Sequence, residues 1–206
     1  MWSFKPQFQV TFTRCRLILP LVLGAFVLVC LYLAFPSPRL LPSDVADVSI
    51  FSSGDVVLFS SATCRGWLVR MSDFGQPYAH VGLIDADHEG IWVIHADPEA
   101  DTVLRQKLDS YLLDNEVSRM AVLTVAAPGN EKAVSFARNA ATNRIPFDND
   151  FKYDEGDGIY CTELVLRAWR EAGIHLIRDV KRGDAIPPSR LLKSPCCRTK
   201  WCRQAR

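Results

Sequence analysis

The hydrophobic positions of the chain form one long uninterrupted run, followed by shorter patterned runs. The long run covers residues 17–35 and contains no charged side chain. A helix of this length covers roughly 28 Å, close to the thickness of a bilayer core. A buried core helix is one alternative, but such a helix would normally have a polar face. A cleaved signal peptide is another, but it would normally have a shorter apolar region, followed by a cleavage site with small residues. The pattern therefore predicts an uncleaved transmembrane helix over 17–35.

Basic residues flank this run unevenly. Three basic residues precede it within 1–16, and Arg39 is the basic residue that follows it closely. Because basic flanks favour the cytoplasmic side of a membrane, we expect 1–16 in the cytoplasm and the body of the protein on the periplasmic or extracytoplasmic side. The proline-rich segment that follows predicts a short linker over 36–48.

Beyond this linker, apolar residues recur with the periods of strands and helices. Runs rich in β-branched residues and bounded by turn formers predict strands, and an i, i+3, i+4 spacing predicts helices. The mixture predicts one α+β domain over 49–192, which is large enough for a single core. The predicted strands are 54–59, 80–84, 91–96 and 119–125, and the predicted helices are 61–72, 103–113, 128–143 and 160–172.

Two histidines lie near the ends of strands that would pair as a hairpin. His80 opens the strand over 80–84, and His95 lies near the end of the strand over 91–96. In a tight antiparallel hairpin these two ends lie side by side. We therefore expect the two imidazoles to be close, although two unrelated, partly solvated histidines would show the same spacing.

Cys161 lies at the start of the helix predicted over 160–172 and follows a loop rich in Asp, Asn and Gly. The free N–H groups at a helix start favour a thiolate, which attacks a carbonyl far better than a thiol does. His80 is the candidate base for this thiol, and His95 is the candidate for fixing the tautomer of His80. A zinc site made from the same three side chains is an alternative, although no Cys-x-x-Cys or His-x-x-x-His spacing supports it.

Several short segments follow one another in a distinctive order, namely Gly54–Val57, His80–Ile84, Val93–Ala96, Pro146–Asp148 and Tyr160–Val165. With the closing segment Ile186–Ser189, they resemble the permuted papain-like amidases of the YiiX/YaeF type. These belong to the NlpC-like superfamily, which also holds the lecithin retinol acyltransferases. The resemblance covers about 50–192.

This resemblance implies a circularly permuted papain-like core, with an antiparallel sheet and a catalytic helix. It implies that Cys161 is the nucleophile, that His80 is the base and that His95 is the third polar residue. No cofactor or metal is expected. The transmembrane helix would precede this core.

The formal net charge of +1 over 206 residues hides an uneven distribution. Residues 1–40 carry +4 and residues 190–206 carry +6, so the middle of the chain carries −9. An acidic body argues against a nucleic-acid partner. The segment 193–206 predicts a solvated basic tail, with binding to anionic lipid headgroups or a disulfide as alternatives. Its cysteines are Cys196, Cys197 and Cys202.

These observations predict a membrane-anchored cysteine hydrolase, similar to a thiol protease or amidase, that cleaves amide bonds through an acyl-enzyme. Cell-wall peptides are one expected substrate class. A lipid acyltransferase or lipase with the same Cys-His-His triad is the first alternative, and a non-catalytic binding domain is the second. The expected partners are a peptide, amide or lipid acyl substrate and the membrane itself through 17–35.

Overall fold

The computed structural model describes residues 38–61, 73, 76–154 and 156–205. The transmembrane helix predicted over 17–35 lies outside these ranges, as does almost all of the helix predicted over 61–72. Within the described ranges, no helix combines the length and the apolar character that crossing a bilayer requires.

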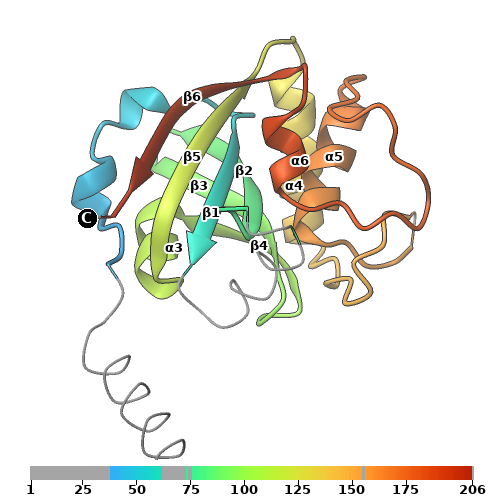
Figure 1. Cartoon of the computed structure of the whole chain (residues 1–206), viewed down its shortest axis with the longest axis horizontal. Coiled ribbons are helices and arrows are strands. Elements are labelled where there is room, and N and C mark those ends of the chain that lie inside the picture. Colours follow the sequence, from blue (N-terminus) through green and yellow to red (C-terminus); the bar gives the residue numbers. More distant parts are fainter. Residues whose placement is uncertain (1–37, 62–72, 74–75, 155, 206) are drawn as a thin grey trace, which may run out of the picture. The chain divides into compact units, whose positions relative to one another are not determined.

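A six-stranded antiparallel sheet forms the centre of the described part of the domain (Figure 1), with the strand order β4-β3-β2-β1-β5-β6. All neighbouring strands run antiparallel. The strands are β1 (Val56–Ser61), β2 (His80–Asp87), β3 (Gly90–Asp97), β4 (Thr102–Lys107), β5 (Val117–Val125) and β6 (Cys197–Gln204).

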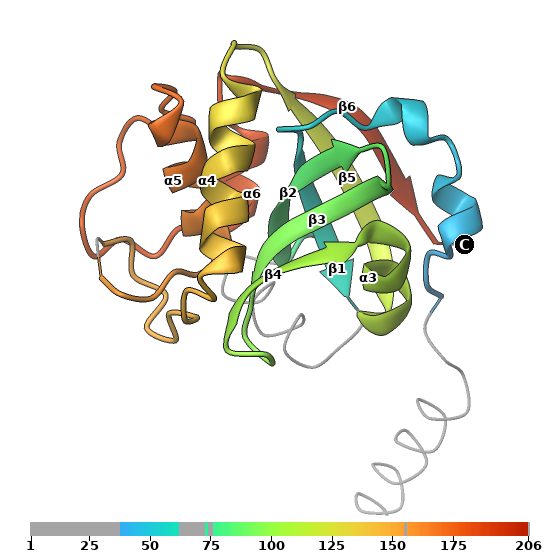
Figure 2. The ribbon, with the colours of Figure 1, turned by 180° about the vertical axis from the view of Figure 1, so that it is seen from behind.

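Helices cover both faces of this sheet. On one face lie α4 (Asn130–Thr142), α5 (Cys161–Glu171) and α6 (Ser189–Leu192), which are grouped together in Figure 2. The other face is covered by α3 (Leu108–Asp114) and by two short 3-10 helices, η1 (Pro42–Val45) and η2 (Val48–Ile50).

The central strand β1 belongs to two hydrophobic cores. Val56 and Leu58 pack in the core that includes α4 and α5, whereas Val57 and Phe59 pack in the core that includes α3. Side chains of a strand alternate between its two faces, so a strand covered on both faces is apolar at every position. This explains the continuous apolar run that predicted β1.

Most of the predicted elements are confirmed. The strands β1 and β5, the hairpin of β2 and β3, and the helices α4 and α5 form where the hydrophobic pattern predicts them. The hairpin turn is tighter than expected, because Asp87 and Gly90 still pair with each other.

The helix predicted over 103–113 is wrong in its first half. Thr102–Lys107 forms β4, and the helix begins only at Leu108. In β4, Val103 is fully buried and pairs with Ala96 of β3. Pairing with the edge of the sheet therefore overrides a loose helical spacing, which is a weak local preference.

The linker predicted over 36–48 is not a free spacer where the structure describes it. Leu40 and Val45 are buried against the α3 face of the sheet, and the Leu40 N–H donates to the Val117 carbonyl at 2.6 Å. The domain therefore begins before residue 49.

The prediction of a solvated tail over 193–206 is also wrong. Residues 197–204 form β6, which pairs along β5 and places Cys202 opposite Ala121. The side chains of β6 are mostly exposed. Because an edge strand of this kind has mostly polar side chains, its sequence is hard to distinguish from that of a solvated tail. Cys196, Cys197 and Cys202 are free thiols.

Candidate active site

Cys161 is the first residue of α5 and is 8% exposed. Tyr160, just before it, has an extended backbone and accepts the first helical hydrogen bond, from the Leu164 N–H. The N–H groups of the first turn, including those of Cys161 and Thr162, therefore have no acceptor within the helix. They are available to the thiol and to any anion that forms beside it.

The sulfur of Cys161 lies among backbone donors. Burial raises the pKa of the Cys161 thiol, and the N–H groups of Val81, Thr162 and Cys161 itself oppose this rise. Val81 directly follows His80 in β2, so this contact places the sulfur beside the start of that strand. Burial has the larger effect, and the thiol is the resting form.

His80 and His95 are hydrogen-bonded to each other. The distance between His80 Nε2 and His95 Nδ1 is 3.1 Å, and the two rings meet nearly edge to face at 85°. One nitrogen of His80 is occupied by this bond, so Nδ1 is the nitrogen left to accept a proton. The expectation that the hairpin brings these two imidazoles together is confirmed.

Both imidazoles are neutral at rest. Burial and the neighbouring His95 ring lower the pKa of His80 well below its usual range. Burial lowers the pKa of His95 to about 4, although Asp97 and the Gln106 side chain oppose this. His95 Nε2 itself is buried and has no hydrogen-bond partner of good geometry. The resting site is therefore a thiol beside two neutral imidazoles.

Gly82 allows these strands to pack closely beside the histidines. A Cβ atom at this position would lie 2.7 Å from Val93 Cγ1, 2.9 Å from the Ile94 carbonyl oxygen and 3.3 Å from His95 Cβ. Such distances are shorter than van der Waals contact. The glycine in the sequence His80-Val81-Gly82 is therefore required by the geometry of the site.

Tyr111 is a member of the site that no sequence pattern indicated. Its ring stacks on His80 with a centroid distance of 6.1 Å and meets His95 edge to face at 4.9 Å. Burial, together with the nearby Cys161 and Asp97, raises its pKa well above the usual range. Tyr111 lies on α3, in a segment whose helix boundary was predicted wrongly, so no local signal connected it to the histidines.

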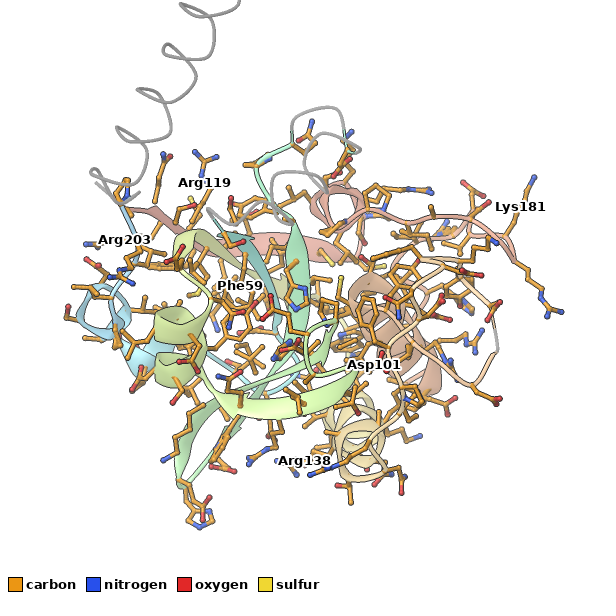
Figure 3. All side chains as sticks on the ribbon, turned by 90° about the horizontal axis from the view of Figure 1, so that it is seen from below. Phe59, Asp101, Arg119, Arg138, Lys181 and Arg203 are labelled. Atoms are coloured by element: carbon orange, nitrogen blue, oxygen red, sulfur yellow. The ribbon has the colours of Figure 1, made fainter. Side chains whose placement is uncertain are left out.

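Cys161, His80 and His95 line one pocket of about 130 Å3. Figure 3 shows Phe59, another lining residue, toward the centre of the domain, while Arg119 and Lys181 extend at its periphery. All three predicted site residues are thus brought to the same cavity. The remaining lining residues are Ser61, Ala79, Asp97, Pro98, Glu99, Tyr111, Asp114, Asn115, Phe147 and Phe151.

Glu163 fixes the loop that precedes Cys161. Its side chain is fully buried, accepts the Asp154 N–H at 3.2 Å and lies 3.7 Å from the Arg167 guanidinium. Burial raises the pKa of Glu163 to about 7. This carboxyl group links the loop that ends before β-bridge residue Ile159 to the helix that carries the thiol, and no sequence pattern indicated its role.

Cys161, His80 and His95 are not placed as ligands of one metal ion. Within the described ranges, no group of three His, Cys, Asp or Glu side chains is placed so that it could hold a metal ion. His80 Nε2 and His95 Nδ1 are hydrogen-bonded to each other, so these two nitrogens do not face a shared ion. The geometry therefore does not fit the zinc alternative.

Comparison with known proteins identifies a structural relative. No protein-family model matches the chain, and no curated protein sequence matches it. The chain is similar to the crystal structure of the metalloprotein yiiX from Escherichia coli O157:H7, with a TM-score of 0.59 and 15% sequence identity. The match covers 72% of this chain and 95% of that one. A likeness at this identity shows a YiiX-like fold, as the short sequence segments indicated.

Proposed function

We propose that this protein is a thiol-dependent acyl hydrolase that cleaves amide bonds through an acyl-enzyme. The observation that supports the proposal best is the shared pocket, in which Cys161 at a helix N-terminus lines the same cavity as the bonded pair His80 and His95. In this proposal Cys161 is the nucleophile, His80 is the general base, and His95 is the positioning residue that fixes the tautomer of His80.

The first half of the reaction forms a thioester. His80 takes the proton of the Cys161 thiol as the sulfur attacks the carbonyl carbon of the amide. The backbone N–H groups at the start of α5 stabilise the oxygen that becomes negatively charged. The protonated His80 then gives its proton to the amine, the C–N bond breaks, and the amine leaves.

The second half regenerates the thiol. His80 takes a proton from a water molecule, whose oxygen attacks the thioester carbonyl. The C–S bond breaks, a carboxylic acid leaves, and the proton returns from His80 to the sulfur. Each proton that His80 accepts is therefore returned within the cycle.

The neutral resting state determines how the thiol is activated. Since burial raises the pKa of Cys161 and lowers that of His80, a stable thiolate–imidazolium pair is disfavoured before substrate arrives. Proton transfer then accompanies attack on the carbonyl. We therefore propose general-base activation of the thiol during attack.

Lipid esters are the second candidate substrate class. Phe147, Phe151 and Phe59 line the pocket beside Cys161, and aromatic walls of this kind suit an acyl chain. The same acyl-enzyme chemistry would then release an alcohol, or transfer the acyl group to another acceptor. The proposed anchor over 17–35 would place the domain on the extracytoplasmic side, next to both cell-wall peptides and lipids.

The proposal is tested with the full-length chain purified in a mild detergent. It is incubated with cell-wall stem peptides and with phosphatidylcholine, quenched with acid and analysed by mass spectrometry. We expect an acyl adduct on Cys161, sensitive to hydroxylamine, that is absent from Cys161→Ala and formed much more slowly by His80→Asn.

Two matched variants serve as controls in this experiment. Cys202 is an exposed thiol on β6, and His88 is an exposed histidine in the hairpin turn. Cys202→Ala and His88→Asn should leave adduct formation unchanged. Adducts that persist in Cys161→Ala, or no adduct with any substrate, would favour the non-catalytic binding domain instead.

A further inference from the structure

One wall of the pocket is acidic. Asp97 and Glu99 lie at and just after the end of β3, and Asp114 lies at the end of α3. All three line the same cavity as Cys161 and the two histidines, and the described lining residues include no Lys or Arg. Among the described residues, the pocket therefore combines Cys161 with negative charges that no lining cation offsets.

The carboxylates of this wall lack cationic partners in the described part of the chain. Asp97 accepts the N–H groups of Glu99 at 2.7 Å and Ala100 at 3.1 Å. Asp114 accepts the Gln106 amide at 2.7 Å. These are all neutral donors, so no cation among the described residues neutralises Asp97 or Asp114.

Two other carboxylates of the domain, Asp85 and Asp55, are paired with cations. Asp85, which is fully buried, accepts from Arg105 Nε at 2.7 Å and Arg138 Nε at 2.8 Å. Asp55 lies 3.2 Å from the Lys200 ammonium group. The described part of the domain supplies cations to these two carboxylates, and no ion pair among the described residues involves Asp97, Glu99 or Asp114.

The negative charge of the wall reaches the reactive groups. Asp97 raises the pKa of both His95 and Tyr111, and each of these side chains is in contact with His80. A positively charged ligand group beside Asp97 would therefore lie close to the catalytic residues. A negatively charged group there would be repelled.

A second part of the pocket wall is aromatic. Phe147 and Phe151 meet edge to face at 5.6 Å, and Phe151 lies 6.0 Å from the ring of Tyr160, which directly precedes Cys161. Phe151 is 42% exposed although it is a large apolar side chain. This wall offers an apolar surface beside the nucleophile.

We propose that the substrate carries an ammonium group close to the scissile carbonyl, together with an apolar group. The inference rests on the proposed hydrolase function and specifies its substrate class. The ammonium group would lie against Asp97, Glu99 and Asp114, and the apolar group against Phe147 and Phe151. The acidic wall would increase the rate for cations and reject acyl compounds whose charge near the carbonyl is negative.

The experiment compares acyl substrates that share one aromatic group and one scissile amide. Each member carries one of four groups near the carbonyl: a primary ammonium group, a trimethylammonium group, a neutral group of the same shape, or a carboxylate group. For the full-length chain we expect kcat/KM to rank both cations above the neutral compound, and the neutral compound above the anion. The preference should shrink in high salt, because screening weakens interactions between partly exposed charges.

Variants of the acidic wall identify the source of the preference. Glu99→Gln and Asp114→Asn should each lower the cation-to-neutral ratio of kcat/KM by about two- to fivefold, the range for a partly exposed charge pair. Glu89→Gln and Asp109→Asn remove exposed carboxylates that do not line the pocket, so they should leave the ratio unchanged. Equal rates for the cationic and neutral compounds would overturn the inference.

A binding measurement separates this inference from the proposed hydrolase function. Cys161→Ala is titrated with the uncleaved cationic and neutral amides, and their dissociation constants are compared. Tighter binding of the cationic amide supports an ammonium site, whether or not the wild-type protein is acylated by any member of the series. Absence of acylation by every member would contradict only the proposed hydrolase function. Acylation of Cys161 without a charge preference would instead overturn only the ammonium site.

Discussion

His80 Nε2 and His95 Nδ1 share a hydrogen bond of 3.1 Å. Burial lowers the pKa of both imidazoles. The bond fixes how the His80 ring is oriented and which of its nitrogens is available to Cys161. A histidine that is held in this way is neutral at physiological pH and can accept a proton during a reaction.

Replacing either histidine should lower activity to different extents. We expect His80→Asn to reduce kcat by about 10²- to 10⁴-fold, the usual contribution of a general base, since no other group would take the thiol proton. His95→Asn should cost less, because an amide can still hydrogen-bond His80. The measurement is the rate of Cys161 acylation, and equal losses for His95→Asn and His88→Asn would contradict the role of His95.

Burial of His95 should make the folded state less stable in acid. The pKa of His95 is about 4 in the folded protein, compared with 6.5 for an ordinary histidine. Between these two pH values the unfolded chain binds a proton at His95 and the folded chain does not. The stability that neutral His95 contributes is therefore lost as the pH falls through that window. Urea unfolding of the wild type and His95→Gln at several pH values should show a weaker decline in the variant.

Glu163 should contribute a pH dependence of the opposite sign. Its pKa is raised to about 7 from 4.5, so the folded state holds a proton that the unfolded state has already released. This contribution is present below about pH 4.5 and is lost as the pH rises toward 7. Glu163→Gln should therefore lose less stability over that rise than the wild type does. A variant with the same pH profile as the wild type would contradict the assignment.

Tyr111 should act through its ring. Tyr111→Phe keeps the stacking on His80 and should leave the folded state nearly as stable, whereas Tyr111→Ala should cost roughly 3 to 5 kcal/mol in unfolding free energy, as for other large buried aromatic side chains. Denaturant unfolding measures this cost. Acylation rates close to wild type in Tyr111→Phe would confirm that the hydroxyl group is dispensable, and a large loss would show that it takes part in the reaction.

Gly82 should not tolerate any side chain. In Gly82→Ala the new methyl group would meet Val93 Cγ1 and the Ile94 carbonyl oxygen at distances below 3 Å. Overpacking of this kind typically costs 1 to 3 kcal/mol, so we expect about that loss of unfolding free energy together with reduced acylation as His95 is displaced. Thermal unfolding and acylation rates of this variant test the prediction, and unchanged values for both would contradict it.

The sequence predicted the elements whose patterns are strong and local. The run over 54–59 is apolar at consecutive positions because both faces of β1 are covered, and α5 has a clear apolar face. The placement of Cys161 at a helix start and the proximity of His80 and His95 in a hairpin also follow from local rules, and the structure agrees with both. The transmembrane helix over 17–35 stays a prediction, because it lies outside the described residues.

The sequence alone predicted β1, β5, the hairpin of β2 and β3, and the helices α4 and α5. It also predicted Cys161 at a helix start with His80 and His95 close together, and its short segments indicated a YiiX-like fold. Only the tertiary structure decided that 102–107 is a strand, that 197–204 joins the sheet, and that Tyr111, Glu163 and the acidic wall belong to the site. These outcomes depend on contacts between residues far apart in the chain. The period of hydrophobic residues and the signals of a helix start depend on neighbours within a few positions of the sequence. The pairing of sheet edges and the lining of a pocket depend instead on how whole helices and strands pack together.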